Sequence, residues 1–121
     1  MKHEKKGIKR ILSAFKNSFD GFLFAFREEE AFRQDLLFFV IGLVLMFVFD
    51  FSIIERVILF SGLFFILFAE IVNSSIEACI DRISSDWHKL SKATKDMGSL
   101  LVLFSFVYFF VVWISIFSKF L

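Results

Sequence analysis

The sequence predicts an all-α membrane protein, and three observations carry that prediction. Hydrophobic residues make up 58% of its 121 residues, whereas ordinary soluble domains contain about 45–50%. The mean hydropathy is +0.75, and no proline is present to interrupt a helix. Three long apolar stretches follow an amphipathic one. The length allows one small domain, which we take as residues 1–121.

The first stretch predicts a helix that lies on the membrane surface. Between residues 8 and 26 the large apolar side chains recur every three or four residues, as on one face of an α-helix. They are Ile8, Ile11, Leu12, Phe15, Phe19, Phe22, Leu23 and Phe26, and the opposite face carries Lys9, Arg10, Lys16, Asn17 and Asp20. A basic face opposite an apolar one suits a helix at about 8–27 lying flat among lipid headgroups. A helix packed on a partner or on the protein's own bundle is the alternative.

Three membrane spans follow, at about 31–49, 54–72 and 99–118. The apolar core of the first, Leu36–Phe49, is shorter than the roughly 20 residues a span needs, so we begin that span near Ala31. The segment 73–98 is polar and rich in helix formers, and it predicts a cytoplasmic helix or loop. Residues 1–35 contain eight Lys and Arg and residues 73–98 contain four, but the turn at 50–56 and the C-terminus contain one each. The positive-inside rule therefore places the N-terminus and segment 73–98 in the cytoplasm.

The candidate catalytic residues begin at Glu70, a carboxylate at the end of the apolar run that starts at Val57. An ionisable group at membrane depth is costly and is by default a candidate functional residue. On one helix, Asn73, Ser74, Glu77 and Asp81 continue the polar stripe from Glu70. The stripe therefore runs from the membrane boundary into water.

Three groups are expected to meet on the cytoplasmic side: the carboxylates near Glu29, the stripe from Glu70 to Glu77, and Lys95 with Asp96. Mg²⁺ prefers one or two carboxylates, with water and phosphate oxygens as its other ligands, and a lysine can bind phosphate. Partly desolvated Glu70 can take a proton from an alcohol held in the bilayer. These parts suggest phosphoryl transfer from a soluble nucleotide to a lipid hydroxyl.

Several motifs carry a resemblance to a known family. They are Ala31-Phe-Arg-Gln34, Glu70-Ile-Val-Asn-Ser-Ser-Ile-Glu-Ala78, Asp81-Arg-Ile83, His88-Lys-Leu-Ser91 and Lys95-Asp-Met-Gly-Ser99. This set resembles the small bacterial diacylglycerol kinases of the inner membrane, from Arg10 to the third span. The resemblance implies a homotrimeric bundle with active sites shared between subunits, Mg²⁺ with ATP as phosphate donor, and diacylglycerol as acceptor.

The resemblance also implies roles for residues. Glu70 matches the family's general base, and Glu29 and Glu77 match its metal-binding carboxylates. Positions that match the nucleotide site are Arg10, Glu29, Asn73, Glu77, Asp86, His88, Lys95 and Asp96. Positions that match the lipid site are Arg10, Ala14, Phe32, Arg33, Gln34, Arg56, Glu70, Ser99 and Trp113. The chain departs from the family's pattern at Asn17, Asp35 and Trp87, and its spans are unusually rich in phenylalanine.

Two other functions and several structural interpretations stay open. Related proteins phosphorylate undecaprenol with the same base and carboxylates, and a non-enzymatic small membrane oligomer would leave Lys95 and Asp96 without a role. Glu28 and Glu30 are expected to be solvated, and a lone His88 is by itself more often a surface residue than a ligand. A net charge of +1 gives no electrostatic support for a nucleic-acid partner.

Overall fold

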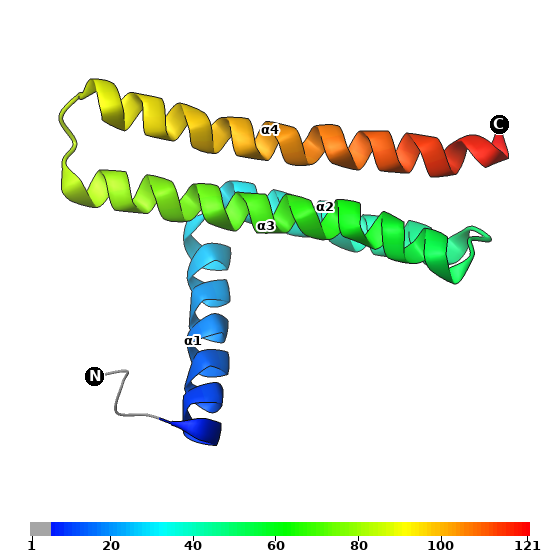
Figure 1. The fold of residues 1–121 in the computed structure, drawn as a ribbon, viewed down its shortest axis with the longest axis horizontal. Helices are drawn as coiled ribbons and strands as arrows, with labels where there is room; N and C mark the ends of the chain where they lie inside the picture. Colours follow the sequence, from blue (N-terminus) through cyan, green and yellow to red (C-terminus); the bar gives the residue numbers. More distant parts are fainter. Residues whose placement is uncertain (1–5) are drawn as a thin grey trace.

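The computed structural model describes residues 6–121, which form four α-helices and one short 3₁₀-helix (Figure 1). The helices are α1 (Gly7–Glu28), α2 (Glu30–Val48), α3 (Ile53–Ile83), α4 (Lys89–Phe117) and η2 (Ser118–Phe120). No strand occurs within residues 6–121. The predicted all-α fold, with an N-terminal amphipathic helix and three long apolar helices, is confirmed.

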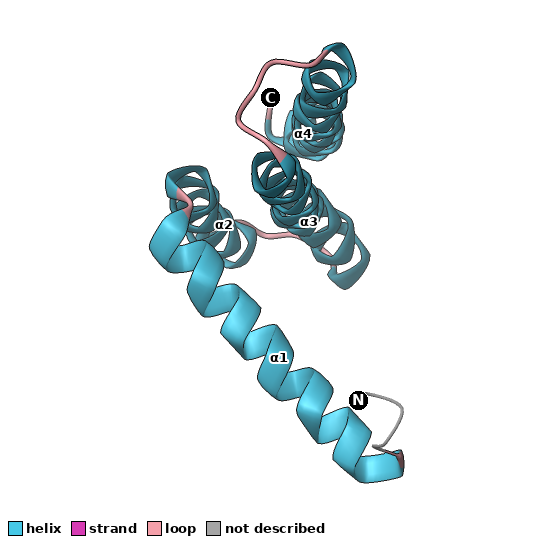
Figure 2. Ribbon diagram, turned by 90° about the vertical axis from the view of Figure 1, so that its left-hand side faces the viewer, coloured by secondary structure: helices cyan, strands magenta, loops and turns pink. Residues whose placement is uncertain are grey.

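Three of the helices form the bundle, and the fourth leaves it. In Figures 1 and 2, α3 lies between α2 and α4 and runs antiparallel to both, and α1 points away across their common direction. The helices α2, α3 and α4 are each long and apolar enough to cross a membrane. Both α3 and α4 continue beyond the start of α2, so one end of the bundle consists of these two helices alone (Figure 1).

That two-helix end corresponds to the polar segment 73–98, which is not a separate helix. Its first part continues α3 to Ile83 and its last part opens α4 at Lys89, leaving a short loop at 84–88. No proline or interior glycine stops α3 there, so the span helix continues into the polar region. The loop ends at His88, where the imidazole Nδ1 accepts a hydrogen bond from the backbone N–H of Leu90 at 3.0 Å. His88 therefore caps α4.

The other helix ends also have local causes. Ser52 and Glu55 form a capping box at the start of α3, in which each side chain accepts the other residue's backbone N–H. Glu29 alone separates α1 from α2, and its extended backbone (φ −115°, ψ 105°) interrupts the helix. Just before it, the carbonyls of Phe26 and Arg27 accept hydrogen bonds from the guanidinium of Arg33, at 2.8 and 3.1 Å.

The core lies where all three long helices meet. It contains Met46, Phe51, Leu59, Leu63, Ile66, Phe109 and Trp113. Gly42 faces Leu63 and Gly62 faces Trp113, and both glycines let neighbouring helices approach closely. The Trp113 indole donates a hydrogen bond to the Leu59 carbonyl at 3.0 Å. At this end of the bundle, the Trp113 indole and Gly62 therefore fix the packing of α3 against α4.

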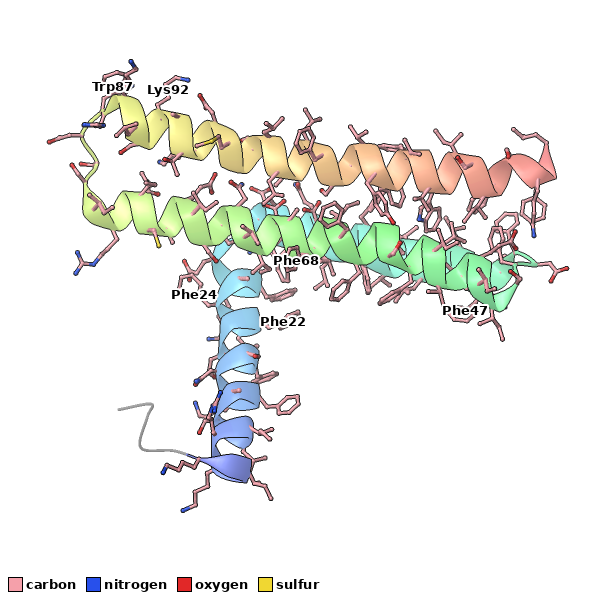
Figure 3. The ribbon with its side chains drawn as sticks, in the orientation of Figure 1. Phe22, Phe24, Phe47, Phe68, Trp87 and Lys92 are labelled. Carbon is pink, nitrogen blue, oxygen red and sulfur yellow. The ribbon has the colours of Figure 1, made fainter. Side chains whose placement is uncertain are left out.

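The outer faces of the helices are apolar. Phe47 on α2 and Phe68 on α3 point outward with 69% and 56% of their surface exposed, and Phe22 and Phe24 line α1 near the bundle (Figure 3). Exposed apolar area on this scale is covered by lipid or by another chain in a stable membrane protein.

Candidate active site

The site is organised around Glu70, which is 6% exposed within α3 and follows the fully buried Ala69. Its side chain lies against that of Asp35 on α2, and the carboxylates of Glu77 and Glu29 also act on it electrostatically. The Asp35 Oδ2 atom is buried and lacks a hydrogen-bond partner within residues 6–121. A carboxyl group buried among other carboxylates is a feature of functional sites more than of packing.

The two predicted metal-binding carboxylates are each held by a neighbouring residue of α3. Asn73 Nδ2 donates a long hydrogen bond to Glu77 Oε2 at 3.5 Å, and Ser74 Oγ donates to Glu29 Oε1 at 3.3 Å. Glu29 is half-buried, but Glu28 and Glu30 on either side are exposed. Glu29 is therefore partly shielded from solvent, unlike the two glutamates next to it in the sequence.

These carboxylates fit Mg²⁺ only as part of a larger ligand set. Within residues 6–121, no group of three or more His, Cys, Asp or Glu side chains is placed to hold a metal ion. Mg²⁺ commonly takes one or two protein carboxylates and completes its shell with water and substrate phosphates. Glu29 and Glu77 are therefore suited to a cation that arrives with phosphate, and not to a closed structural metal site.

Gly98 on α4 fixes the position of Asn73. Asn73 is 8% exposed and Gly98 is buried. A Cβ atom on Gly98 would overlap Asn73 Oδ1 and lie 3.3 Å from Asn73 Cγ. The α4 backbone therefore lies against the oxygen side of the amide. That leaves the amide NH₂ directed at Glu77, the orientation in which it donates to the carboxylate.

A second group of predicted residues surrounds an open pocket of about 390 Å³ at the loop end of α3 and α4. Its lining includes four residues assigned to nucleotide by resemblance, namely Asp86, His88, Lys95 and Asp96. Trp87 projects from the loop and is 76% exposed (Figure 3). Lys95 pairs with Asp81 at 2.6 Å, and this hydrogen bond raises the pKa of Lys95 above its ordinary value. The ammonium group is therefore charged at neutral pH.

The residues assigned to lipid are spread along the molecule. Arg10 and Ala14 lie exposed on α1, Gln34 is exposed on α2 and Ser99 is exposed on α4 beside Gly98. Phe32 is 3% exposed and packs edge-on against Phe22, with ring centroids 5.6 Å apart. Arg33 is bonded to the end of α1 as described above.

Arg56 and Trp113 lie toward the opposite end of the bundle. The Arg56 guanidinium donates to the carbonyls of Met46 and Phe49, at 2.9 and 3.2 Å, so it caps the end of α2. Trp113 belongs to the core near Leu59. Within a single chain these two residues are not brought to Glu70.

Three contributions to the site were not evident from the sequence. The sequence places Ser74 in the polar stripe without indicating a partner. It marks Asp35 only as a departure from the family pattern, and Gly98 only as part of a motif. The Ser74 and Asp35 contacts join different helices, so helical periodicity could not reveal them. A glycine inside an otherwise helical stretch can mark close packing, as at Gly98, but the signal is not specific, since no atom lies within 4 Å of a Cβ at Gly21.

Comparison with known proteins gives a consistent family. A family model described as prokaryotic diacylglycerol kinase matches residues 16–117. The chain is 43% identical over 110 residues to the diacylglycerol kinase of Pseudomonas aeruginosa, covering 91% of this chain and 89% of that protein. It is 37% identical over 113 residues to the diacylglycerol kinase of Escherichia coli K12, covering 93% of each. For the diacylglycerol kinase of Helicobacter pylori 26695 the identity is 33% over 108 residues, covering 89% and 84%.

Replacing Gly98 by alanine should destabilise the protein, because the added methyl group displaces Asn73. The expected loss is about 1–3 kcal/mol, typical of an overpacked interior, measured by unfolding in detergent micelles. Gly21→Ala is the matched control, since no atom lies within 4 Å of a Cβ at Gly21. This control should be neutral or slightly stabilising, because alanine favours a helix over glycine by about 0.5–1 kcal/mol. Equal effects of the two substitutions would contradict the contact.

Proposed function

Because the chain belongs to the prokaryotic diacylglycerol kinase family, we propose that it transfers the γ-phosphate of ATP to the free hydroxyl of diacylglycerol, giving phosphatidic acid. The observation that carries this proposal is the burial of Glu70 beside two further carboxylates that neighbouring residues hold in place. The Glu70 carboxylate suits proton abstraction, and the Glu29 and Glu77 carboxylates suit a cation bound to phosphate.

The proposed reaction assigns one step to each group. Glu70 takes the proton from the lipid hydroxyl, whose oxygen forms a bond to the γ-phosphorus as the bond between that phosphorus and the β–γ bridging oxygen breaks. ADP leaves with the bridging oxygen. Glu29 and Glu77 would hold Mg²⁺, which when bound neutralises phosphate charge. Asn73 orients Glu77, and Lys95 supplies a further positive charge to the phosphates.

The disposition in the membrane follows from the position of α1. With α1 in the headgroup layer, the bilayer surface lies near the level of Glu29 and Ser74, so Glu70 is just on the lipid side. The loop end of α3 and α4, where residues 81–90 are all exposed, then lies in water with the nucleotide. We place the N-terminus and this loop on the cytoplasmic side of the bacterial inner membrane, in agreement with the distribution of basic residues.

The lipid would lie along the helix faces on the membrane side of Glu29 and Ser74. Its hydroxyl would lie at Glu70, and Phe32, Arg33, Gln34 and Ser99 lie nearest to that level. Arg10 and Ala14 lie 19 and 15 residues before Glu29 on α1, which points away from the bundle (Figure 1), so they would contact lipid along the membrane surface and not at Glu70 of the same chain. Leu59, which contacts Trp113, lies eleven residues along α3 from Glu70, or roughly 16 Å at 1.5 Å per residue. Half of the hydrocarbon core is about 15 Å thick. Trp113 is therefore at the depth of acyl-chain ends, and Arg56 is deeper still.

A homotrimer would complete the site. In one chain the polar stripe opens between helices whose outer faces carry exposed apolar side chains such as Phe68 and Phe104. A second subunit packed on such a face would cover apolar area and close the site from the side. We therefore propose that active sites are shared between subunits.

The substrate assay tests the proposal directly. Purified protein in micelles is given labelled ATP and Mg²⁺, with diacylglycerol and undecaprenol offered in parallel. We expect diacylglycerol to be labelled faster. Faster labelling of undecaprenol would reassign the acceptor and keep the base and carboxylates. Labelling of neither by folded, trimeric protein would support a non-enzymatic role.

Glu70→Gln should abolish turnover and leave nucleotide binding nearly intact, because only the proton acceptor is lost. Positioned general bases contribute about 10²–10⁴-fold to rate, so kcat should fall by at least about 100-fold. Glu28→Gln, an exposed carboxylate at the end of α1, is the control and should keep full activity. Residual turnover near the wild-type rate would remove Glu70 from this role.

Glu77→Ala and Glu29→Ala should each raise the Mg²⁺ concentration needed for half-maximal activity, because each removes a proposed cation ligand. A loss of about 10-fold or more in apparent metal affinity is expected, measured by titrating Mg²⁺ at fixed ATP. Glu28→Ala serves as the neighbouring control. An unchanged Mg²⁺ requirement in both variants would argue against the ligand assignment.

A further inference from the structure

The position of the Glu29 side chain depends on a contact outside its own helices. Glu29 is the single non-helical residue between α1 and α2, and its side chain caps neither helix. Its backbone is bonded to both helices, since its N–H donates to the Ala25 carbonyl at 2.9 Å and its carbonyl accepts from the Arg33 N–H at 3.2 Å, but these bonds leave the side chain unconstrained. The carboxylate is held instead by Ser74, whose Oγ lies 3.3 Å from Glu29 Oε1.

Ser74 behaves differently from the other serines for which hydrogen bonds within helices are described. A helical serine ordinarily donates its hydroxyl to a carbonyl three or four residues earlier in its own helix. Ser18, Ser61, Ser75 and Ser105 all do so, with Oγ to oxygen distances of 2.6–2.9 Å. The Ser74 hydroxyl instead donates to a carboxylate 45 residues away in the chain.

The partner of the Ser74 hydroxyl matters because the adjacent residue also holds a carboxylate. Asn73 donates to Glu77, so two consecutive residues of α3 each orient one of the two proposed cation ligands. Bringing Glu29 and Glu77 together places two negative charges near a third, that of Glu70, and neutral donors offset part of the repulsion without occupying the site. Mutating a group that orients a metal ligand by a hydrogen bond typically lowers metal affinity by about 10–100-fold.

We propose that Ser74 is a positioning residue that holds the Glu29 carboxylate against α3, so that Glu29 and Glu77 bind one divalent cation together. This inference rests on the proposed function, because it assigns the cation site to those two carboxylates. The proposal does not depend on Asn17, on Asp35 or on the residues of the 84–88 loop. Among residues 6–121, the Ser74 hydroxyl is the side-chain hydrogen-bond donor that joins α3 to the α1–α2 junction.

The test compares Ser74→Ala with Ser75→Ala, its neighbour on the same helix. Ser75 is exposed and donates to the Ile71 carbonyl of its own helix at 2.8 Å, so its loss should not affect a cation site. Mn²⁺ binding is measured by electron paramagnetic resonance in the presence of a non-hydrolysable ATP analogue, which requires no turnover. Ser74→Ala should weaken Mn²⁺ binding by about 10-fold, the lower end for groups that orient metal ligands, and Ser75→Ala should not.

Two further variants separate positioning from a general structural effect. Ser74→Thr keeps the hydroxyl and should restore Mn²⁺ affinity to within about 2-fold of wild type, because a helical threonine can present its Oγ1 in the same direction. In a Glu29→Gln background, Ser74→Ala should add little further loss, since residues that act through one contact are not additive. Alanine is the better helix former, so Ser74→Ala should fold.

The outcomes distinguish this inference from the proposed function. Wild-type Mn²⁺ affinity in Ser74→Ala, or failure of Ser74→Thr to restore it, would overturn the positioning role and leave the kinase assignment intact. Absence of any divalent-ion binding or requirement in the wild-type protein would overturn the cation site itself, and the positioning role with it. Failure of the wild-type protein to phosphorylate lipid is a separate result, read in the substrate assay.

Discussion

The structure depends on keeping one carboxyl group, that of Glu70, out of water at the point where the apolar part of the bundle ends. Placing such a group in an apolar interior is costly unless polar neighbours compensate. The neighbours of Glu70 add to this cost, since Asp35 lies against it and Glu29 and Glu77 are near. The neutral donors Asn73 and Ser74 bind Glu77 and Glu29, so they hold the surrounding carboxylates and not Glu70 itself. The helices on either side must approach closely enough to exclude solvent, and that requirement accounts for the buried Gly98 opposite Asn73.

Close approach is achieved differently at the two ends of the bundle. At the core end, α3 and α4 are joined by large rings, with Trp113 stacked between Phe109 and Phe117 and bonded to the Leu59 carbonyl. At the polar end, Gly98 lies against the Asn73 amide and Lys95 pairs with Asp81, whereas the Trp87 ring projects from the loop and is exposed. An apolar ring near Glu77 would exclude the cation and phosphate that the proposed reaction needs. The phenylalanine content of the chain is therefore concentrated where only packing is required.

Much of the fold could be predicted from the sequence, because hydrophobic periodicity reports directly on helices. The amphipathic helix and the three apolar helices are present as predicted, but α3 and α4 extend well into segment 73–98. The continuity of α3 through Ile83 was not predicted, because a change from apolar to polar residues marks a membrane boundary and not a helix end. The polar stripe from Glu70 to Glu77 follows from spacing along a single helix. Contacts between helices, such as Ser74 with Glu29 and Asn73 with Gly98, could not be predicted, because they depend on how the helices are rotated about their axes.

The unbroken course of α3 has a consequence for how this stretch can change. Glu70, Asn73 and Glu77 keep one face because each is a near-integral number of turns from the next, and no loop between them can absorb an extra residue. Inserting one residue between Glu70 and Asn73 would rotate everything after it by about 100° relative to Glu70, moving Glu77 away from Glu29 while leaving every side chain chemically intact. We therefore expect the length of this stretch to be constrained as strictly as its side chains, and insertions or deletions to be better tolerated in the 84–88 loop and the 49–52 turn.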